Sequence, residues 1–274
     1  MTGDRANTTP WRVAAVQMVS GTSVADNLEA AGRGIAEAAA AGAKLVALPE
    51  YFCLMGRADT DKVALREQPG SGPIQAALAQ CAKDHGVWLV GGTLPLATSA
   101  PGKVRNSTLV FDAQGRQVAR YDKIHLFGFR QGSEAYDEAQ TIEAGEGAVR
   151  LDTPWGAVGL AICYDLRFPE LFRELGRLDL MVVPAAFTHT TGSAHWEVLL
   201  RARAIENQCY VLAAAQGGRH ENGRRTWGHS MLVDPWGEIV SELGEGPGVV
   251  VGEVSRQRLA EVRGKLPALA HRVL

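Results

Sequence analysis

Four cysteines are the candidate nucleophiles in this sequence. Cys81 lies on the apolar stripe of an expected helix and Cys209 at the start of an apolar strand, so both are predicted core residues. Cys53 follows a Pro-Glu pair that ends a strand, and its sequence context does not settle whether it is a core residue. Cys163 ends an apolar strand and precedes the helix expected from Pro169, so we expect it to face a crevice. Backbone N–H groups and the helix dipole there favour a thiolate over the free thiol pKa of about 8.5.

Two charged residues share the placement of Cys163. Glu50 follows the apolar run Leu45–Pro49, and Lys123 follows an expected strand that ends at Tyr121. Taken singly, each charged side chain is more simply explained as a solvated residue at a strand end, and Asp122 could pair with Lys123. Together they place a base, a cation and a thiol at the ends of strands, where open α/β sheets build their sites. The set predicts nucleophilic catalysis by Cys163.

Other catalytic and cofactor motifs are missing from the sequence. It contains no G-x-G-x-x-G after a strand, no G-x-x-x-x-G-K-[ST] phosphate loop and no G-x-S-x-G nucleophile turn. His189 and His195 lack the one-face helical spacing of a zinc motif. We therefore expect no metal and no cofactor.

Strands and helices alternate along the whole chain without a linker or a repeat. This pattern predicts one α/β domain spanning residues 1–274, with sheets covered by helices. The apolar strands do not alternate cleanly with polar residues, which indicates burial on both faces. The principal helices are expected over Asp26–Ala41, Pro73–His85, His195–Cys209 and Ser255–Arg263, and the principal strands over Arg12–Met18, Lys44–Leu48, Val87–Thr93, Ser107–Phe111, Gln117–Tyr121, Val149–Asp152, Ala157–Cys163, Leu180–Phe187, Tyr210–Ala215, Ser230–Val233, Glu238–Ser241 and Val249–Val254.

The charge balance argues against two classes of partner. Lys and Arg number 28 against 30 Asp and Glu, so no strong field attracts nucleic acid or an anionic membrane. The start of the chain is polar and does not resemble a secretory signal, and no apolar run approaches the ~20 residues of a spanning helix. With four scattered cysteines and no C-x-x-C pair, the cytoplasm is the expected compartment.

Three segments resemble the catalytic segments of the nitrilase superfamily. They are LPEYF around Glu50, YDKIHLF around Lys123 and ICYDLRFPELF around Cys163, and the likeness extends over nearly the whole chain. The resemblance implies a four-layer α-β-β-α sandwich, a Glu-Lys-Cys enzyme without metal or cofactor, and a homodimer or larger homo-oligomer. It also implies a second glutamate after the lysine, which Glu138 matches best and Glu134 second.

The chemistry suits an amide substrate. Glu50 would take the thiol proton, provided that burial raises its pKa towards neutrality. Lys123 and the backbone N–H of Tyr164 would stabilise the oxyanion. Glu138 would orient Lys123 or the attacking water.

Residues after the cysteine resemble the Nit amidase branch, because Tyr164-Asp165 stands where true nitrilases carry Trp-Glu. The segments Thr190–His220 and Trp227–Val240 resemble deaminated glutathione amidases more than ω-amidases, which act on α-ketoglutaramate. The predicted reaction is hydrolysis of the terminal amide of a 2-oxo acid to a carboxylate and ammonia. A non-catalytic α/β binding or scaffold protein is the alternative of another class.

The loop that follows the strand ending at Phe187 is expected to line the substrate pocket. Thr188, Thr190 and Thr191 offer hydroxyl groups, and either Arg167 or Arg203 could bind a carboxylate. The helix expected from His195 carries apolar groups beyond one narrow stripe. Together with the helix after Cys163, it is the predicted interface between protomers.

Overall fold

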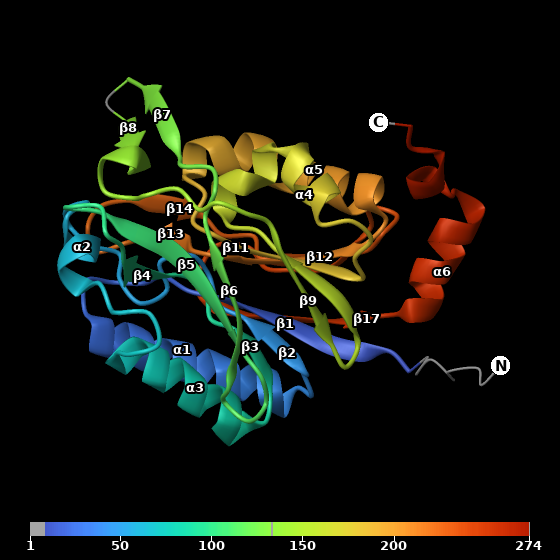
Figure 1. The fold of residues 1–274 in the computed structure, drawn as a ribbon, viewed down its shortest axis with the longest axis horizontal. Coiled ribbons are helices and arrows are strands. Elements are labelled where there is room, and N and C mark those ends of the chain that lie inside the picture. Colours follow the sequence, from blue (N-terminus) through green and yellow to red (C-terminus); the bar gives the residue numbers. More distant parts are fainter. Residues whose placement is uncertain (1–8, 133, 274) are drawn as a thin grey trace.

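Two β-sheets lie face to face at the centre of the computed structural model, which describes residues 9–132 and 134–273. Helices α1 (Val24–Ala40) and α3 (Pro73–His85) cover the outer face of the first sheet. Helices α4 (Pro169–Glu174) and α5 (His189–Asn207) cover the second (Figure 1). The fold is therefore a four-layer α-β-β-α sandwich.

The first sheet has strand order β17-β1-β2-β3-β5-β4, with β6 paired to β5, and the second has order β16-β15-β12-β11-β10-β9. The strands of the first sheet are β1 (Trp11–Gln17), β2 (Leu45–Ala47), β3 (Trp88–Val90), β4 (Leu94–Ala97), β5 (Val104–Phe111), β6 (Gln117–Asp122) and β17 (Gly248–Val254). Those of the second are β9 (Val149–Thr153), β10 (Gly156–Leu160), β11 (Leu180–Ala185), β12 (Tyr210–Ala215), β15 (Met231–Val233) and β16 (Ile239–Glu242).

Alternation along β1 explains why both of its faces are buried. Val13 and Ala15 point into the core between the two sheets, whereas Ala14 and Val16 pack under α1 and α3. Residues on alternate sides of a strand thus join two different cores. The expected burial on both faces is confirmed.

The two sheets meet at the carboxyl ends of their parallel strands. β1 and β2 run parallel in the first sheet, and β10, β11 and β12 run parallel in the second. A parallel bridge between Met18 and Gln216 joins the end of β1 to the end of β12. Loops that leave the parallel strands of both sheets consequently emerge at one end of the sandwich.

The predicted bounds of α3 are those observed, and the predicted bounds of α1 and of the last long helix agree to within two residues. The Ser23 side chain accepts a hydrogen bond from the Asp26 N–H at the start of α1, and Gly86, with φ 61°, ends α3. Ser255 caps the last long helix, α6 (Arg256–Lys265).

The predicted start of α5 was wrong. The helix begins at His189 and not at His195, because the Thr188 side chain accepts a hydrogen bond from the Thr191 N–H and caps it. Gly192 lies inside the helix where it passes Trp227, and a Cβ at this position would lie 2.3 Å from the Trp227 Cβ. The Thr-rich segment, expected as a loop, is therefore mostly the first turn of a helix.

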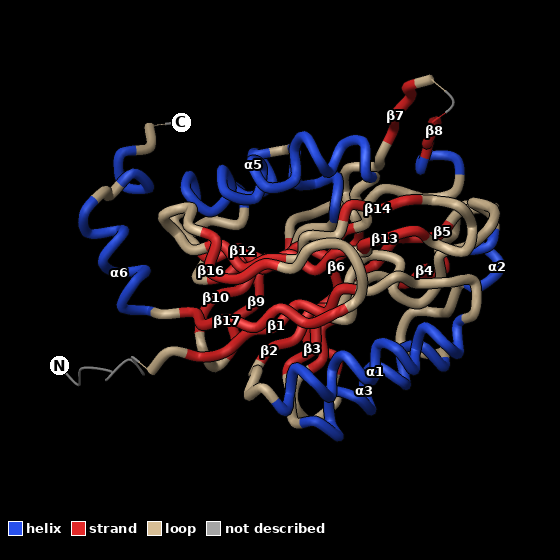
Figure 2. The backbone as a smooth tube through the Cα atoms, turned by 180° about the vertical axis from the view of Figure 1, so that it is seen from behind, coloured by secondary structure: helices blue, strands red, loops and turns tan. Residues whose placement is uncertain are grey.

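Short elements were not predicted. Two β-ribbons lie at the same end of the molecule, as Figure 1 and the view from behind in Figure 2 agree. The unpredicted elements are α2 (Asp61–Leu65), β4, the ribbon of β7 (Gly128–Gln131) with β8 (Glu134–Asp137), the ribbon of β13 (Gly217–Arg219) with β14 (Arg225–Trp227), and the 3-10 helices η1 (Glu138–Gln140), η2 (Cys163–Arg167) and η3 (Ala268–His271).

In the described ranges, no helix has the length and apolar character needed to cross a membrane.

Candidate active site

The three candidate residues converge although they come from distant parts of the chain. Glu50 follows β2, Lys123 follows β6 and Cys163 follows β10, so the two sheets contribute to one site. All three are buried: Glu50 and Lys123 are 1% exposed and Cys163 is 7% exposed. Their placement at strand ends agrees with the expectation from the sequence.

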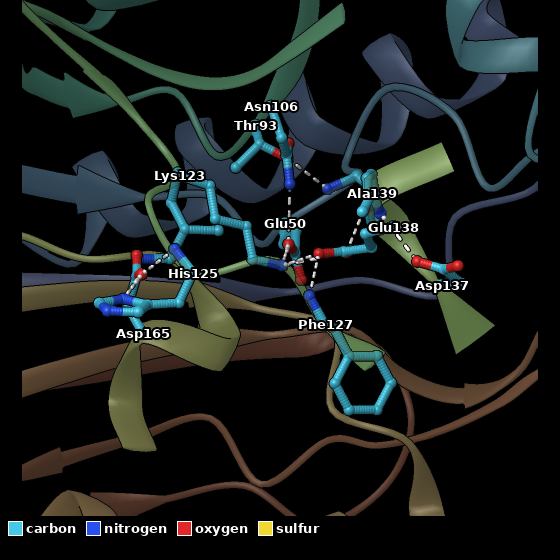
Figure 3. A network of polar contacts seen from close by, with 12 residues as sticks. Glu50, Thr93, Asn106, Lys123, His125, Phe127, Asp137, Glu138, Ala139 and Asp165 are labelled. Carbon is cyan, nitrogen blue, oxygen red and sulfur yellow. Dashed lines mark hydrogen bonds and ion pairs between the residues drawn. The ribbon is translucent and has the colours of Figure 1, made fainter. Parts of the chain in front are cut away.

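Lys123 binds two carboxylates (Figure 3). Its Nζ lies 2.9 Å from Glu50 Oε1 and 3.0 and 2.8 Å from the two oxygens of Glu138. Asp122, the alternative partner, pairs with Arg120 instead. Glu134 does not join this cluster, because its carboxylate accepts a hydrogen bond from Thr190. The second glutamate at the lysine is therefore Glu138.

Neutral donors complete the coordination of both carboxylates. Asn106 Nδ2 donates to Glu50 Oε1 at 2.9 Å. The Tyr51 hydroxyl and the Phe127 N–H each donate to Glu138 at 2.7 Å. Since buried charges are costly without such partners, the network holds the three charged groups in fixed positions.

The buried charges shift one another's pKa values. Burial raises the pKa of Glu50, and the nearby Lys123 opposes this shift only in part. Burial alone would also raise the pKa of Glu138, but the Lys123 charge together with the hydrogen bonds from Lys123, Phe127 and Tyr51 outweighs it, so that pKa is lowered. The pKa of Lys123 is raised, because the two carboxylates outweigh the effect of burial. Glu138 thus serves as the permanent counter-ion, and Glu50 is the carboxylate more ready to take a proton.

Cys163 sits at the first position of η2 in a strained backbone conformation. Its φ is 49°, a left-handed value that is uncommon for residues other than glycine. The thiol hydrogen-bonds to Glu50. Because Glu50 Oε1 is engaged by Lys123 and Asn106, Oε2 remains as the natural acceptor of the thiol proton.

The expectation of a stabilised thiolate was wrong. Burial, followed by the nearby Glu50 charge, raises the pKa of Cys163 well above its ordinary value, and Lys123 lowers it only in part. The resting group is therefore a thiol. Such a thiol becomes a strong nucleophile when the adjacent carboxylate removes its proton during attack.

Asp165 ties the cysteine loop to the lysine loop, a role that the sequence analysis did not assign. This fully buried carboxylate accepts hydrogen bonds from the Ile162 N–H, the Tyr121 hydroxyl and the His125 N–H, at 2.8, 2.7 and 3.0 Å. His125 also stacks on Phe168, with ring centroids 3.7 Å apart. The only signal was the presence of Tyr121, His125 and Asp165 in the same motifs as the candidate residues.

A small cavity opens beside the thiol, and four of the predicted pocket residues belong to its wall, whereas Thr190 lies outside it and donates to Glu134. The four are Arg167, Phe187, Thr188 and Thr191, which line it together with Phe127, Cys163, Tyr164 and Ala186. Arg167 lies over the rings of Tyr164 and Phe187, at 5.7 and 5.2 Å from their centroids. Arg203 is not in this wall: it donates to the Leu166 carbonyl and pairs with Glu206.

Within residues 9–132 and 134–273, no group of three or more His, Cys, Asp or Glu side chains could hold a metal ion. The arrangement next to the cavity combines a thiol, a carboxylate that can take its proton and a buried ammonium. These are the parts needed for nucleophilic addition to a carbonyl carbon and for stabilisation of the resulting oxyanion.

Comparisons with known proteins agree with this chemistry. The model of the carbon-nitrogen hydrolase family matches residues 12–264. A deaminated glutathione amidase from Yersinia enterocolitica is 42% identical, over 94% of this chain and 92% of that protein. The human omega-amidase NIT2 is 37% identical, over 94% of each chain. The crystal structure of the Caenorhabditis elegans NitFhit protein superposes with a TM-score of 0.85 at 37% identity, and the match covers 97% of this chain but 65% of that longer one.

Proposed function

The chain belongs to the carbon-nitrogen hydrolase family and is a hydrolase of amide carbon–nitrogen bonds, and we propose that its substrate is deaminated glutathione. The observation that carries the mechanism is the contact of one buried ammonium, Lys123, with two carboxylates beside the Cys163 thiol. A non-catalytic scaffold would have no need to bury three charged groups around a thiol, because such burial is costly.

Acylation begins with transfer of the Cys163 proton to Glu50. The sulfur forms a bond to the amide carbon, and the carbonyl π electrons move to oxygen. Lys123 and the Tyr164 N–H stabilise this oxyanion, an effect worth about 3–4 kcal/mol for one such donor. Glu138 keeps the ammonium of Lys123 in place throughout.

Collapse of the tetrahedral intermediate breaks the carbon–nitrogen bond. The departing amine takes the proton held by Glu50, which leaves a thioester on Cys163 and restores the carboxylate. With deaminated glutathione this amine is cysteinylglycine, so the ammonia expected from the sequence is the product only of a primary amide. Glu50 then removes a proton from water, the hydroxide oxygen attacks the thioester, and the same proton returns to sulfur. The products are a carboxylate, an amine and the free enzyme, so no cofactor is consumed.

The two candidate substrates differ in their leaving group. Both carry a 2-oxoglutaryl acyl group, but α-ketoglutaramate releases ammonia whereas deaminated glutathione releases cysteinylglycine. Arg167 and the Thr191 hydroxyl are the groups we assign to the 2-oxo acid end, because they line the cavity beside Cys163. Similarity to relatives with both names keeps α-ketoglutaramate as the second candidate.

The test measures release of 2-oxoglutarate, the product common to both substrates. We expect a clearly higher kcat/KM for deaminated glutathione than for α-ketoglutaramate, and scarcely any turnover of simple nitriles. Concentrations must refer to the open-chain keto-amides, and Cys163→Ala supplies the blank. Equal values, or a preference for α-ketoglutaramate, would overturn the substrate assignment and leave the mechanism standing.

We also propose a homodimer or larger assembly through α4 and α5. Trp196 and Leu200 are buried within the protomer, but Val198 is 67% exposed and Ile205 48% exposed on the outer side of α5. Light scattering that finds only monomer at micromolar concentration would contradict this. All four cysteines are free thiols, which supports a reducing compartment such as the cytoplasm.

A further inference from the structure

A second cavity lies between the two β-ribbons and the first turn of α5. Its wall comes from β8, from the start of α5 and from the turn between β13 and β14. The residues that matter here are Tyr136, Asn222, Arg224 and Arg225. Figure 1 places both ribbons at one end of the molecule. The mechanism proposed above uses none of these side chains.

Arg224 is a half-buried cation without a salt bridge to any described acidic residue. Its guanidinium lies 4.7 Å from the centroid of the Tyr136 ring, and its Nη1 is 3.9 Å from the sulfur of Met55. Its side chain also hydrogen-bonds to Tyr136 and lies in the field of Asp59, but it has no salt bridge with an Asp or Glu that the structure describes. The neighbouring Arg225, in contrast, binds Glu245 Oε1 at 2.6 Å.

Most other polar groups of this cavity already have partners, although the Nε of Arg225 has none. Glu134, its one carboxylate, accepts a hydrogen bond from Thr190 at 2.8 Å. Asn222 Nδ2 donates to the Gly56 carbonyl at 2.6 Å, and His189 Nε2 lies 3.7 Å from Glu245. Arg224 is therefore the group best placed to bind an anion that enters the cavity.

An aromatic wall connects this cavity with the nucleophile. The Tyr136 ring packs on Phe127 at 5.5 Å, and Phe127 packs on Tyr164 at 5.2 Å. Phe127 and Tyr164 also line the cavity that contains Cys163. An extended substrate whose carbonyl lies at the thiol could follow this wall as far as Arg224.

We infer that Arg224 binds the terminal carboxylate of the amine half of the substrate. This inference rests on the proposed function, and it assigns the glycine carboxylate of deaminated glutathione to the second cavity. A planar guanidinium donates two parallel hydrogen bonds to a carboxylate, and stacking on Tyr136 presents it in a fixed orientation. α-Ketoglutaramate has no amine half beyond its NH₂ group, so it cannot use this site.

The experiment compares three enzymes on three substrates. Arg224→Met removes the charge at nearly constant length. Arg219→Met, at an exposed cation of β13 that does not line the cavity, is the matched control. The substrates are deaminated glutathione, its analogue with the glycine carboxyl converted to a carboxamide, and α-ketoglutaramate. Release of 2-oxoglutarate gives kcat/KM for each pair, and thermal unfolding reports on the fold of each variant.

We expect Arg224→Met to lower kcat/KM for deaminated glutathione by about 10- to 100-fold, the range for a lost charged hydrogen bond. Values for α-ketoglutaramate should stay within about threefold, and Arg219→Met should leave both substrates within the same range. On the wild-type enzyme the carboxamide should be as poor as deaminated glutathione is on Arg224→Met. This arm needs no variant, so it remains decisive if Arg224→Met folds badly.

Two failures have different meanings. If the wild-type enzyme hydrolyses deaminated glutathione and its carboxamide equally well, the Arg224 site is wrong and the proposed function stands. The same holds if Arg224→Met lowers turnover of both natural substrates alike. If the wild-type enzyme hydrolyses α-ketoglutaramate but not deaminated glutathione, the proposed substrate itself is wrong and the inference falls with it.

Discussion

Cys163 and Cys209 are both buried thiols at the ends of strands of the same sheet, yet their surroundings differ. Cys163 follows β10 and contacts Glu50, with the Lys123 ammonium close by. Cys209 precedes β12, and its N–H donates to the Ala204 carbonyl at the end of α5. Burial raises the pKa of Cys209 to about 12. Among described residues, no side chain hydrogen-bonds to its sulfur.

The comparison shows that burial does not distinguish the proposed nucleophile from a core cysteine. It raises the pKa of both thiols. What differs is the acceptor, because only Cys163 has a buried carboxylate positioned to remove its proton. The strained φ of 49° at Cys163 is the second difference, since it is retained in spite of its conformational cost.

Removal of each thiol gives the largest expected contrast. Cys163→Ala should lower kcat by about 10⁴-fold or more, because it removes the nucleophile. Cys209→Ala should leave kcat nearly unchanged and cost some stability through a small cavity. Steady-state kinetics and thermal unfolding of the two variants provide the comparison. Comparable losses of activity would mean that Cys209 is more than a core residue.

Two buried glutamates, Glu50 and Glu67, allow a second comparison of the same kind. Glu50→Gln should lower kcat by about 10²- to 10⁴-fold, the usual range for loss of a general base. Glu67 instead accepts the Ile74 N–H at 2.6 Å at the start of α3. Glu67→Gln should therefore reduce stability, by about 0.5–2 kcal/mol, and retain most of the activity. Kinetics together with urea unfolding would separate the two roles, and full activity in Glu50→Gln would exclude it as the base.

The pH dependence of kcat/KM tests the raised pKa of Glu50, with a smaller expected effect than the substitutions above. Burial raises the pKa of Glu50 above 4.5, and the protonated carboxyl cannot accept the thiol proton. kcat/KM should reach its plateau above this raised pKa, and it should fall by about tenfold per pH unit below it. Alkylation of Cys209 in the Cys163→Ala variant should show no break at this pH, because its rate follows the thiolate fraction and falls about tenfold per pH unit throughout the range below a pKa of about 12. An acid limb in kcat/KM at or below pH 4.5 would contradict the raised pKa of Glu50.

The sequence predicted which residues converge better than it predicted their protonation. Glu50, Lys123 and Cys163 could be placed because each follows an apolar strand, and position along a strand is a local property. The raised pKa of Cys163 could not, since it depends on Glu50, 113 residues away in the sequence, and on burial by both sheets. A helix dipole was the only effect visible locally, and it gave the wrong direction.

Local sequence patterns could not predict the residues that support the site, for a similar reason. Asn106, Tyr51 and Asp165 act through contacts with partners 40 to 87 positions away. The ribbons β7–β8 and β13–β14 were also missed, because strands of three or four residues carry too little periodicity to predict. The start of α5 failed because the cap at Thr188 was not recognised among several threonines.

The most direct test of the account is detection of the thioester itself. Wild-type enzyme and Glu50→Gln, which should hydrolyse the intermediate more slowly, are mixed with substrate, quenched in acid within milliseconds and digested for mass spectrometry. We predict a 2-oxoglutaryl adduct on the peptide that contains Cys163, and none in Cys163→Ala. An adduct on Cys53 or Cys209, or turnover that continues in Cys163→Ala, would contradict the assignment of the nucleophile.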